Sequence, residues 1–160
     1  MKKRALPWIC AALVTVLLWQ LLTALLIPKY MTSSPEGALI AEYYEEETSH
    51  QVLFVGDCEV YENFSPVTLW QEYGITSYIR GSAQQLIWQS YYLLEEMLRR
   101  ESPEAVVFNV LSVKYDTPQN EAYNRMSIDG MKWSSSKWGA IRASMTDEEQ
   151  AITYFLPLLR

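Results

Sequence analysis

The N-terminal part of the chain holds a long apolar run, which limits what the protein can be more than any other feature of the sequence. From Pro7 to Ile27 there is no charge, and the only polar interruptions are Thr15, Gln20 and Thr23. A helix needs about 20 apolar residues to cross the hydrocarbon core of a bilayer. This run can therefore span a membrane.

The charges that flank the run predict its orientation. Lys2, Lys3 and Arg4 precede it, whereas the chain that follows soon becomes acidic. The positive-inside bias keeps the basic end in the cytoplasm. We expect a single-pass protein of the cell membrane, with a cytoplasmic N-terminus and an extracellular domain.

A cleaved signal peptide is the alternative reading of the same run. Its apolar region is usually about 7 to 15 residues long and ends at a small-x-small cleavage site. The run here is longer, and it leads into Ile27, Pro28 and Lys29, which offer no such site. An uncleaved anchor over residues 1–29 is the favoured interpretation.

The charge balance of the remaining chain excludes some partners. Four of the 13 basic residues lie within residues 1–29, so the rest has 9 basic and 19 acidic residues and a net charge of −10. That excess argues against a nucleic-acid partner and against bulk attraction to anionic lipid. We expect an acidic tether over 30–50, which includes the Glu42 to Glu47 cluster, and one domain over 51–160.

The chain has two cysteines, and the predicted bilayer separates them. Cys10 lies inside the apolar run and Cys58 outside it, so the two cannot form a disulfide within one chain. Cys58 is therefore a lone thiol, either reactive or buried. One histidine and one external cysteine do not make a metal site, and we predict neither metal nor cofactor.

Three short apolar runs separated by helical patterns predict an α/β domain. Short β-favouring apolar runs are typical of buried parallel strands. Their alternation with helices favours a doubly wound parallel sheet, although three strands are few for such a sheet. We expect strands over 51–56, 75–79 and 105–111, helices over 66–73 and 83–100, and a last helix opened by a capping box of Thr146 and Glu149.

The longest helical pattern, over 83–100, carries charge pairs on its predicted wet side. Glu95 with Arg99 and Glu96 with Arg100 have the i,i+4 spacing and order that stabilise a helix. Aromatic side chains at helical spacing are more often core than sugar-binding residues. This interpretation covers Trp70, Trp88, Tyr91, Tyr92, Trp133 and Trp138.

Candidate site residues follow the three predicted strands. Ligands of open α/β sheets bind beyond the carboxyl ends of the strands. There the sequence places Asp57 and Cys58 after the first strand, Gly81 after the second and Asn109 near the end of the third. Cys58 has the position of a nucleophile, which a helix N-terminus would activate, and Gly81 could bring an N–H donor close to a carbonyl. Asp57 is interpreted mainly as a turn cap.

At these residues the chain resembles the SGNH (GDSL-like) hydrolase superfamily. Gly56-Asp57-Cys58 is similar to its Gly-Asp-Ser block, with cysteine in place of the nucleophilic serine, and Gly81 is similar to the glycine of its second block. The closer resemblance, over most of 51–160, is to membrane-anchored bacterial members of the kind that transfer D-alanine to teichoic acid or O-acetylate polysaccharides. It implies a flavodoxin-like sheet and an oxyanion hole formed by the N–H groups of Cys58 and Gly81.

Two departures from the family pattern concern the general base and the third block. The family's base is a histidine in a C-terminal segment, and the family members continue past the stretch similar to Pro157-Leu-Leu-Arg160, so we expect a C-terminally truncated chain with an incomplete sheet. The only histidine, His50, precedes the first strand, which spans about 20 Å at roughly 3.3 Å per residue. His50 is therefore not the base. No clear Gly-x-Asn-Asp block follows the third strand.

The resemblance implies an acyl-ester hydrolase or acyltransferase with Cys58 as nucleophile. Its substrates would be cell-envelope polymers, either polysaccharide or teichoic acid, and it would work with a membrane acyl-transfer partner. The alternative is a non-catalytic membrane-anchored remnant or partner-binding module, which the missing base supports. A third hypothesis, a redox or thioester-acceptor thiol, requires an exposed Cys58 with a low pKa.

Overall fold

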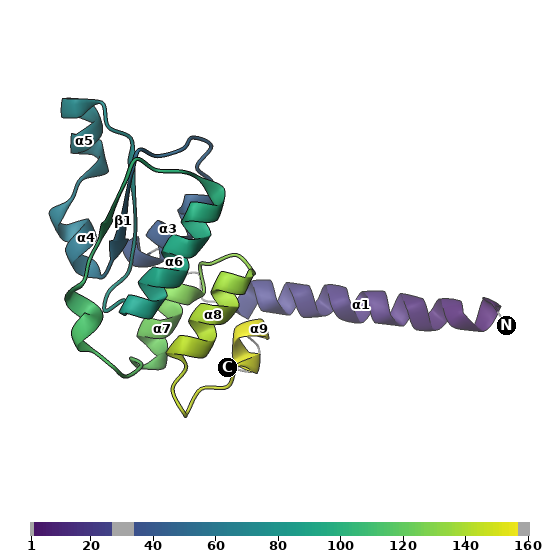
Figure 1. Ribbon diagram of the computed structural model, residues 1–160. Helices are drawn as coiled ribbons and strands as arrows, with labels where there is room; N and C mark the ends of the chain where they lie inside the picture. Colours follow the sequence, from purple (N-terminus) through teal and green to yellow (C-terminus); the bar gives the residue numbers. More distant parts are fainter. Residues whose placement is uncertain (1, 27–33, 157–160) are drawn as a thin grey trace. The chain divides into compact units, whose positions relative to one another are not determined.

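A computed structural model describes residues 2–26 and 34–156 of the chain (Figure 1). The N-terminal helix α1 covers Lys2–Leu26, and an α/β domain follows it. The described residues divide into two units: one contains α1 and the residues from 152 to 156, and the other, from 34 to 151, is the α/β domain.

Helix α1 is long and apolar enough to cross a membrane. Its segment Leu6–Leu25 has a mean hydropathy of 2.0, and none of it is buried by other parts of the protein. Within the described residues, this is the one helix with that length and composition. A membrane anchor and a signal sequence share these properties, so the helix is consistent with both.

The domain is built on a parallel sheet of three strands, which confirms the predicted α/β class. The strands are β1 (Val52–Gly56), β2 (Ser77–Gly81) and β3 (Ala105–Phe108). Their spatial order is β2-β1-β3, so β1 lies in the centre with a parallel neighbour on each side. In this register Gly56 lies opposite Gly81, which brings the carboxyl ends of β1 and β2 level.

Helices cover both faces of the sheet (Figure 1). Side chains of a strand alternate between its faces. On β2, Tyr78 donates to the carbonyl of Leu39 in α3 (Pro35–Ala41), whereas Ile79 packs with Phe54 and Val60 on the other face. The first face also receives α6 (Ile87–Arg100), and the second receives α4 (Cys58–Asn63) and α5 (Pro66–Tyr73).

The remaining elements include two helices that the sequence did not predict. These are α7 (Glu121–Ile128) and α8 (Ser135–Ser144). Helix α8 packs on α6 so closely that a methyl group on Gly139 would lie 2.3 Å from the Tyr92 ring. The short elements of the domain are η1 (Glu42–Tyr44) and η2 (Leu111–Lys114), whereas the short helix α9 (Ile152–Phe155) belongs to the same unit as α1.

Several predicted boundaries differ from the structure for local reasons. The helix predicted from residue 83 begins at Ile87, because Ala83 and Gln84 form a turn that the amide of Gln85 closes onto the carbonyl of Ser82. The strand predicted over 105–111 ends at Phe108, where Asn109 instead accepts a hydrogen bond from the amide of Leu111. Thr146 and Glu149 do bond as in a capping box, but no helix follows them directly. The predicted helix start there is wrong.

The acidic segment predicted as a tether packs as part of the domain over the residues that the structure describes. Ile40 and Tyr43 are buried, while Glu42 and Glu45 to Glu47 stay exposed. The exposed acidic side chains thus lie on η1 and on the segment directly after it, whereas Ile40 and Tyr43 are part of the core. Residues 30–33 lie outside the described part of the chain.

The prediction that the aromatic residues at helical spacing are core is wrong for four of the six. Their exposed fractions are 59% for Trp70, 54% for Tyr91, 52% for Trp133 and 38% for Trp138. Trp88 and Tyr92 are partly buried. The core consists instead of aliphatic and methionine side chains, of three other aromatic residues, Tyr43, Phe54 and Tyr154, and of buried polar groups.

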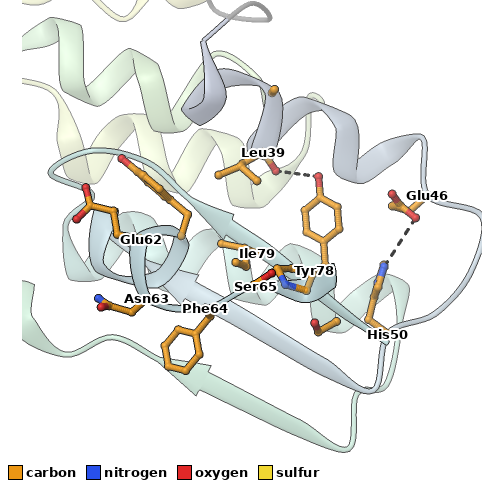
Figure 2. A pocket seen from close by; sticks show the side chains of 13 residues that line it. Leu39, Glu46, His50, Glu62, Asn63, Phe64, Ser65, Tyr78 and Ile79 are labelled. Carbon is orange, nitrogen blue, oxygen red and sulfur yellow. Dashed lines mark hydrogen bonds and ion pairs between the residues drawn. The ribbon is translucent and has the colours of Figure 1, made fainter. Parts of the chain in front are cut away.

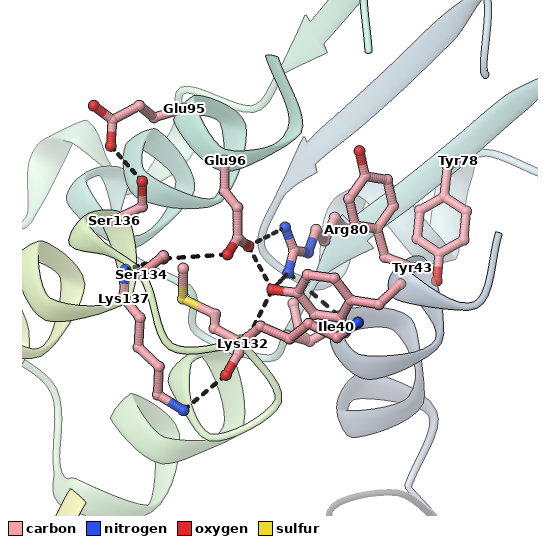
Figure 3. A network of polar contacts seen from close by, with 12 residues as sticks. Ile40, Tyr43, Tyr78, Arg80, Glu95, Glu96, Lys132, Ser134, Ser136 and Lys137 are labelled. Atoms are coloured by element: carbon pink, nitrogen blue, oxygen red, sulfur yellow. Dashed lines mark hydrogen bonds and ion pairs between the residues drawn. The ribbon is translucent and has the colours of Figure 1, made fainter. Parts of the chain in front are cut away.

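A buried arginine connects four elements of the domain (Figure 3). Arg80 of β2 is fully buried, its Nη1 lies 2.7 Å from Glu96 of α6, and its Nη2 donates to the hydroxyl of Tyr44 at 2.7 Å. The Nη1 contact is short but poorly aligned for a hydrogen bond, so we count it as an ion pair. The guanidinium also lies over the ring of Tyr43, 4.6 Å from its centroid. Tyr44 accepts from the amide of Lys132 as well, which brings in the loop before α8.

Candidate functional site

The turn after β1 places Cys58 at the start of a helix. Asp57 is the N-cap of α4, and its Oδ1 accepts a hydrogen bond from the amide of Glu59 at 3.1 Å. The predicted capping role of Asp57 is confirmed. Cys58 is the first residue of the helix, so its amide has no acceptor within the helix.

The end of β3 reaches the same turn through Asn109. Its Nδ2 donates to Asp57 Oδ1 at 3.2 Å, while its own Oδ1 accepts from the amide of Leu111 at 2.7 Å. Gly56 makes this approach possible, since a Cβ added there would lie 2.4 Å from the Cβ of Asn109. Asn109 therefore holds the turn of the candidate nucleophile against β3.

The end of β2 also lies close to the turn after β1. A Cβ added to Gly81 would lie 2.6 Å from the carbonyl oxygen of Gly56, 2.7 Å from Cγ2 of Val60 and 3.3 Å from the carbonyl oxygen of Asp57. Only a glycine allows the strand to pass here. Four candidate residues thus lie together at the carboxyl edge of the sheet: Asp57, Cys58, Gly81 and Asn109. At this edge the central strand β1 is flanked by β2 on one side and by β3 on the other. Open α/β sheets bind ligands at such a point.

The electrostatic surroundings of Cys58 oppose its ionisation. Partial burial raises the pKa of the thiol, and the negative charges of Asp57 and Glu62 raise it further. The sequence predicts the opposite effect, a thiol activated by a helix N-terminus. The helix is present, but burial together with the negative charges of Asp57, Glu62 and Glu59 outweighs the favourable contribution of the backbone N–H to the pKa of the thiol.

The only histidine of the chain lies at the other end of β1, as predicted. His50 precedes the strand, and its amide donates to Glu101 at 2.7 Å. Its Nδ1 lies 3.1 Å from the same carboxylate, and its Nε2 lies 3.8 Å from Glu46. These contacts fix the imidazole near the amino end of the sheet, away from Cys58. His50 has a structural role there.

Thiol labelling of Cys58 tests this description of its surroundings. In a Cys10→Ala background, we expect iodoacetamide to react more slowly at neutral pH than it does with free cysteine. The rate should keep rising about tenfold per pH unit beyond pH 8.5, where free cysteine, with a pKa of about 8.5, begins to level off. Glu62→Gln, which removes one of the opposing charges, should increase the rate at neutral pH severalfold. Labelling faster than that of free cysteine would contradict the prediction.

A buried polar cluster behind the loop after β2 was missed by the sequence reasoning. Ser82 follows Gly81 directly, and its hydroxyl lies 2.5 Å from that of Ser127 in α7 and 3.2 Å from Gln85 Oε1. The loop also contains Gln84, whose φ of 54° lies in the left-handed region. Ser82, Gln85 and Ser127 are all fully buried, and their hydrogen bonds connect the loop to α7. The sequence feature that could have indicated this cluster is Ser82, directly after the glycine that ends β2.

The described residues, 2–26 and 34–156, contain no group of three or more His, Cys, Asp or Glu that could hold a metal ion. Comparison of the chain with known protein families, with curated proteins and with solved structures gave no match.

Proposed function

We propose that this protein is a membrane-anchored acyl-ester hydrolase or acyltransferase of the SGNH type, with Cys58 as its nucleophile and acyl esters of cell-envelope polymers as its substrates. The observation that carries the proposal is the meeting of Asp57, Cys58, Gly81 and Asn109 at one edge of a parallel sheet. A doubly wound, flavodoxin-like sheet is part of the proposal.

The proposed reaction begins with attack of Cys58 Sγ on the ester carbonyl. The ester C–O bond breaks, a thioester forms, and the thiol proton goes through a base to the leaving alcohol. Water or an acceptor hydroxyl then attacks the thioester and releases the thiol. The amides of Cys58 and Gly81 are the proposed donors to the oxyanion.

The base is the part of this reaction that the described residues do not provide. His50 is held by Glu101 at the opposite end of β1, and the groups whose charges act on the thiol are carboxylates that raise its pKa. The proposal therefore requires a base from a group outside the described residues, on this polypeptide or on its acyl-transfer partner.

Trapping the acyl-enzyme tests the proposal. The full chain in detergent micelles is incubated with p-nitrophenyl acetate, and its intact mass is measured with and without its membrane partners. We expect a mass increase of one acetyl group at Cys58 and turnover above that of the Cys58→Ala variant. Loss of the base typically costs several orders of magnitude, about 10³ to 10⁶ in kcat, so single-turnover conditions are needed. Equal behaviour of the wild-type protein and Cys58→Ala in every preparation, including native membranes, would overturn the proposal.

A non-catalytic membrane-anchored module is the second candidate. The raised pKa of Cys58 favours it, because a thiol that stays protonated is a weak nucleophile. Under this alternative, Asp57 and Asn109 only join β1 to β3. Cys58→Ala would then leave every cellular phenotype unchanged, whereas deletion of the domain would not.

A further inference from the structure

A groove runs along β2 on the side away from β1 (Figure 2). It has a volume of about 790 Å³, and at one point its two sides are joined by a hydrogen bond from the hydroxyl of Tyr61 in α4 to Glu36 in α3. Residues 38 and 39 of α3 form one wall, and the other wall is formed by 61–66, which comprise the end of α4, the two connecting residues and the first residue of α5. Ser77, Tyr78 and Ile79 of β2 lie between the two walls. Since α3 and α4 lie on opposite faces of the sheet, the groove follows the strand edge itself.

The backbone groups of β2 that face this groove have no strand beside them. Val52 of β1 donates to the carbonyl of Thr76 and is paired in register with Ser77. In a parallel pair, alternate residues direct both backbone groups to the same side. The backbone of Tyr78 therefore faces β1, and the backbones of Ser77 and Ile79 face the groove. Within the described part of the chain, β1 is the only strand paired with β2.

Ser77 also carries a side-chain group without a partner among the described residues. Its hydroxyl oxygen is buried and has no hydrogen-bond partner within the described residues. Buried polar atoms in proteins are nearly always satisfied. A chain segment lying in the groove would bring backbone donors and acceptors within reach of the Ser77 and Ile79 backbones.

The charges around the groove select the kind of segment. The carboxylates of Glu46 and Glu62 line it, together with the rings of Tyr61, Phe64 and Tyr78. The single basic group of the lining, His50, is already engaged by Glu46 and Glu101. Carboxylates beside aromatic rings favour lysine and arginine side chains, through charge and through cation–π contacts.

We propose that the free edge of β2 binds an extended, basic segment of a partner protein by strand addition. Backbone hydrogen bonds to Ser77 and Ile79 provide affinity, as in other complexes formed by strand addition. The acidic and aromatic side chains of the groove provide the preference for basic residues. A second copy of this chain fits less well, because the part outside residues 1–29 has a net charge of −10 and would repel its own kind. This binding is independent of any reaction at Cys58.

Peptide binding to the full chain in detergent micelles tests the proposal on the wild-type protein. The probe is a fluorescein-labelled peptide of alternating valine and lysine, followed by fluorescence anisotropy at low ionic strength. Two matched peptides serve as comparisons, one with glutamate in place of lysine and one with its edge-pairing amides N-methylated. We expect each to bind at least about tenfold more weakly than the parent. If the N-methylated peptide binds as well as the parent, the attraction is bulk charge and strand addition is wrong.

Substitutions on β2 test the site. Ser77→Pro removes the outward N–H at the first residue of an edge strand, a position that tolerates proline, and leaves the pairing with β1 intact. We expect about a tenfold loss of peptide affinity, whereas Ser77→Ala, which keeps the N–H, should lose about threefold or less. Unchanged affinity in a folded Ser77→Pro variant would overturn the proposal. If that variant does not fold, the N-methylated peptide tests the same backbone pairing on the wild-type protein.

A matched pair of variants tests the proposed preference for basic peptides. Glu62→Gln in the groove should weaken binding of the lysine peptide about twofold to fivefold at low salt, and Glu72→Gln, an exposed glutamate on α5 outside the groove, should not. Equal effects of the two variants would overturn the assigned preference. If no peptide binds and the protein instead self-associates in a way that Ser77→Pro abolishes, a second copy is the occupant and the proposed partner is wrong.

Discussion

Replacing Arg80 with methionine is expected to lower the free energy of unfolding by about 3 kcal/mol, a large share of the roughly 5 to 15 kcal/mol that stabilises a domain of ordinary size. Methionine roughly fills the space of the arginine stem but leaves the carboxylate of Glu96 without its cation. The Glu96 side chain is only 12% exposed, so water replaces little of the lost contact. Tyr44 also loses the donor at 2.7 Å.

Urea unfolding of the full chain in micelles, followed by near-ultraviolet circular dichroism, measures this effect. The matched control is Arg99→Met, which breaks the pair of Arg99 with Glu95 at 2.9 Å. Arg99 is 53% exposed, and exposed pairs of this kind contribute about 0.5 kcal/mol or less. In the double variant Arg80→Met/Glu96→Gln, the second change should cost less than Glu96→Gln alone, because the charge it removes is already unpaired. A loss below about 1 kcal/mol for Arg80→Met would contradict the role assigned to the buried pair.

The sheet and the placement of the candidate site were predictable because both depend on local patterns and general topology. Short apolar runs predict strands, and parallel strands joined by helices bring their carboxyl ends to one edge. That argument is enough to place Asp57, Gly81 and Asn109 together without any knowledge of their contacts. The turn after β1 was also predictable from the sequence, because aspartate is a favoured N-cap residue.

Helices α7 and α8 were missed because their buried faces are largely polar. Ser136, Lys137 and Ser144 of α8 are buried, as are Asn124 and Arg125 of α7. A search for apolar periodicity assigns such residues to the surface. Ser134 and Asn120, which cap the two helices, were the available local signals.

The partner of Glu96 could not be read from spacing along one helix. The i,i+4 rule pairs Glu96 with Arg100, and the corresponding pair of Glu95 with Arg99 does form. Glu96 instead faces the sheet and pairs with Arg80, while Arg100 donates to the carbonyls of Tyr44 and Glu46. The choice depends on which side of α6 packs on β2, which is tertiary information. The same holds for Ile40 and Tyr43, whose burial is hidden by the acidic residues around them.

The second large effect is expected at the site itself, from Gly81→Ala. The added methyl group would lie 2.6 Å from the carbonyl oxygen of Gly56, a backbone atom of the neighbouring strand, and 2.7 Å from Val60. The strand cannot withdraw without loosening its pairing with β1, so we expect a loss of about 2 to 3 kcal/mol in the free energy of unfolding. Because the same contact reaches the carbonyl of Asp57, the turn that holds Cys58 should move as well, and its iodoacetamide labelling rate should change.

Two comparisons separate this clash from the general cost of replacing a glycine. Gly74→Ala places alanine at a φ of 69° with nothing within 4 Å of the added methyl group, so only backbone strain of about 1 kcal/mol applies. Adding Val60→Ala to Gly81→Ala removes one of the two closest contacts but leaves the other, and should recover part of the methyl clash while costing its own cavity. If Gly81→Ala and Gly74→Ala lost the same stability and Cys58 labelling did not change, close packing would not be the reason for glycine at this position. The resemblance to the second-block glycine would then need another physical explanation.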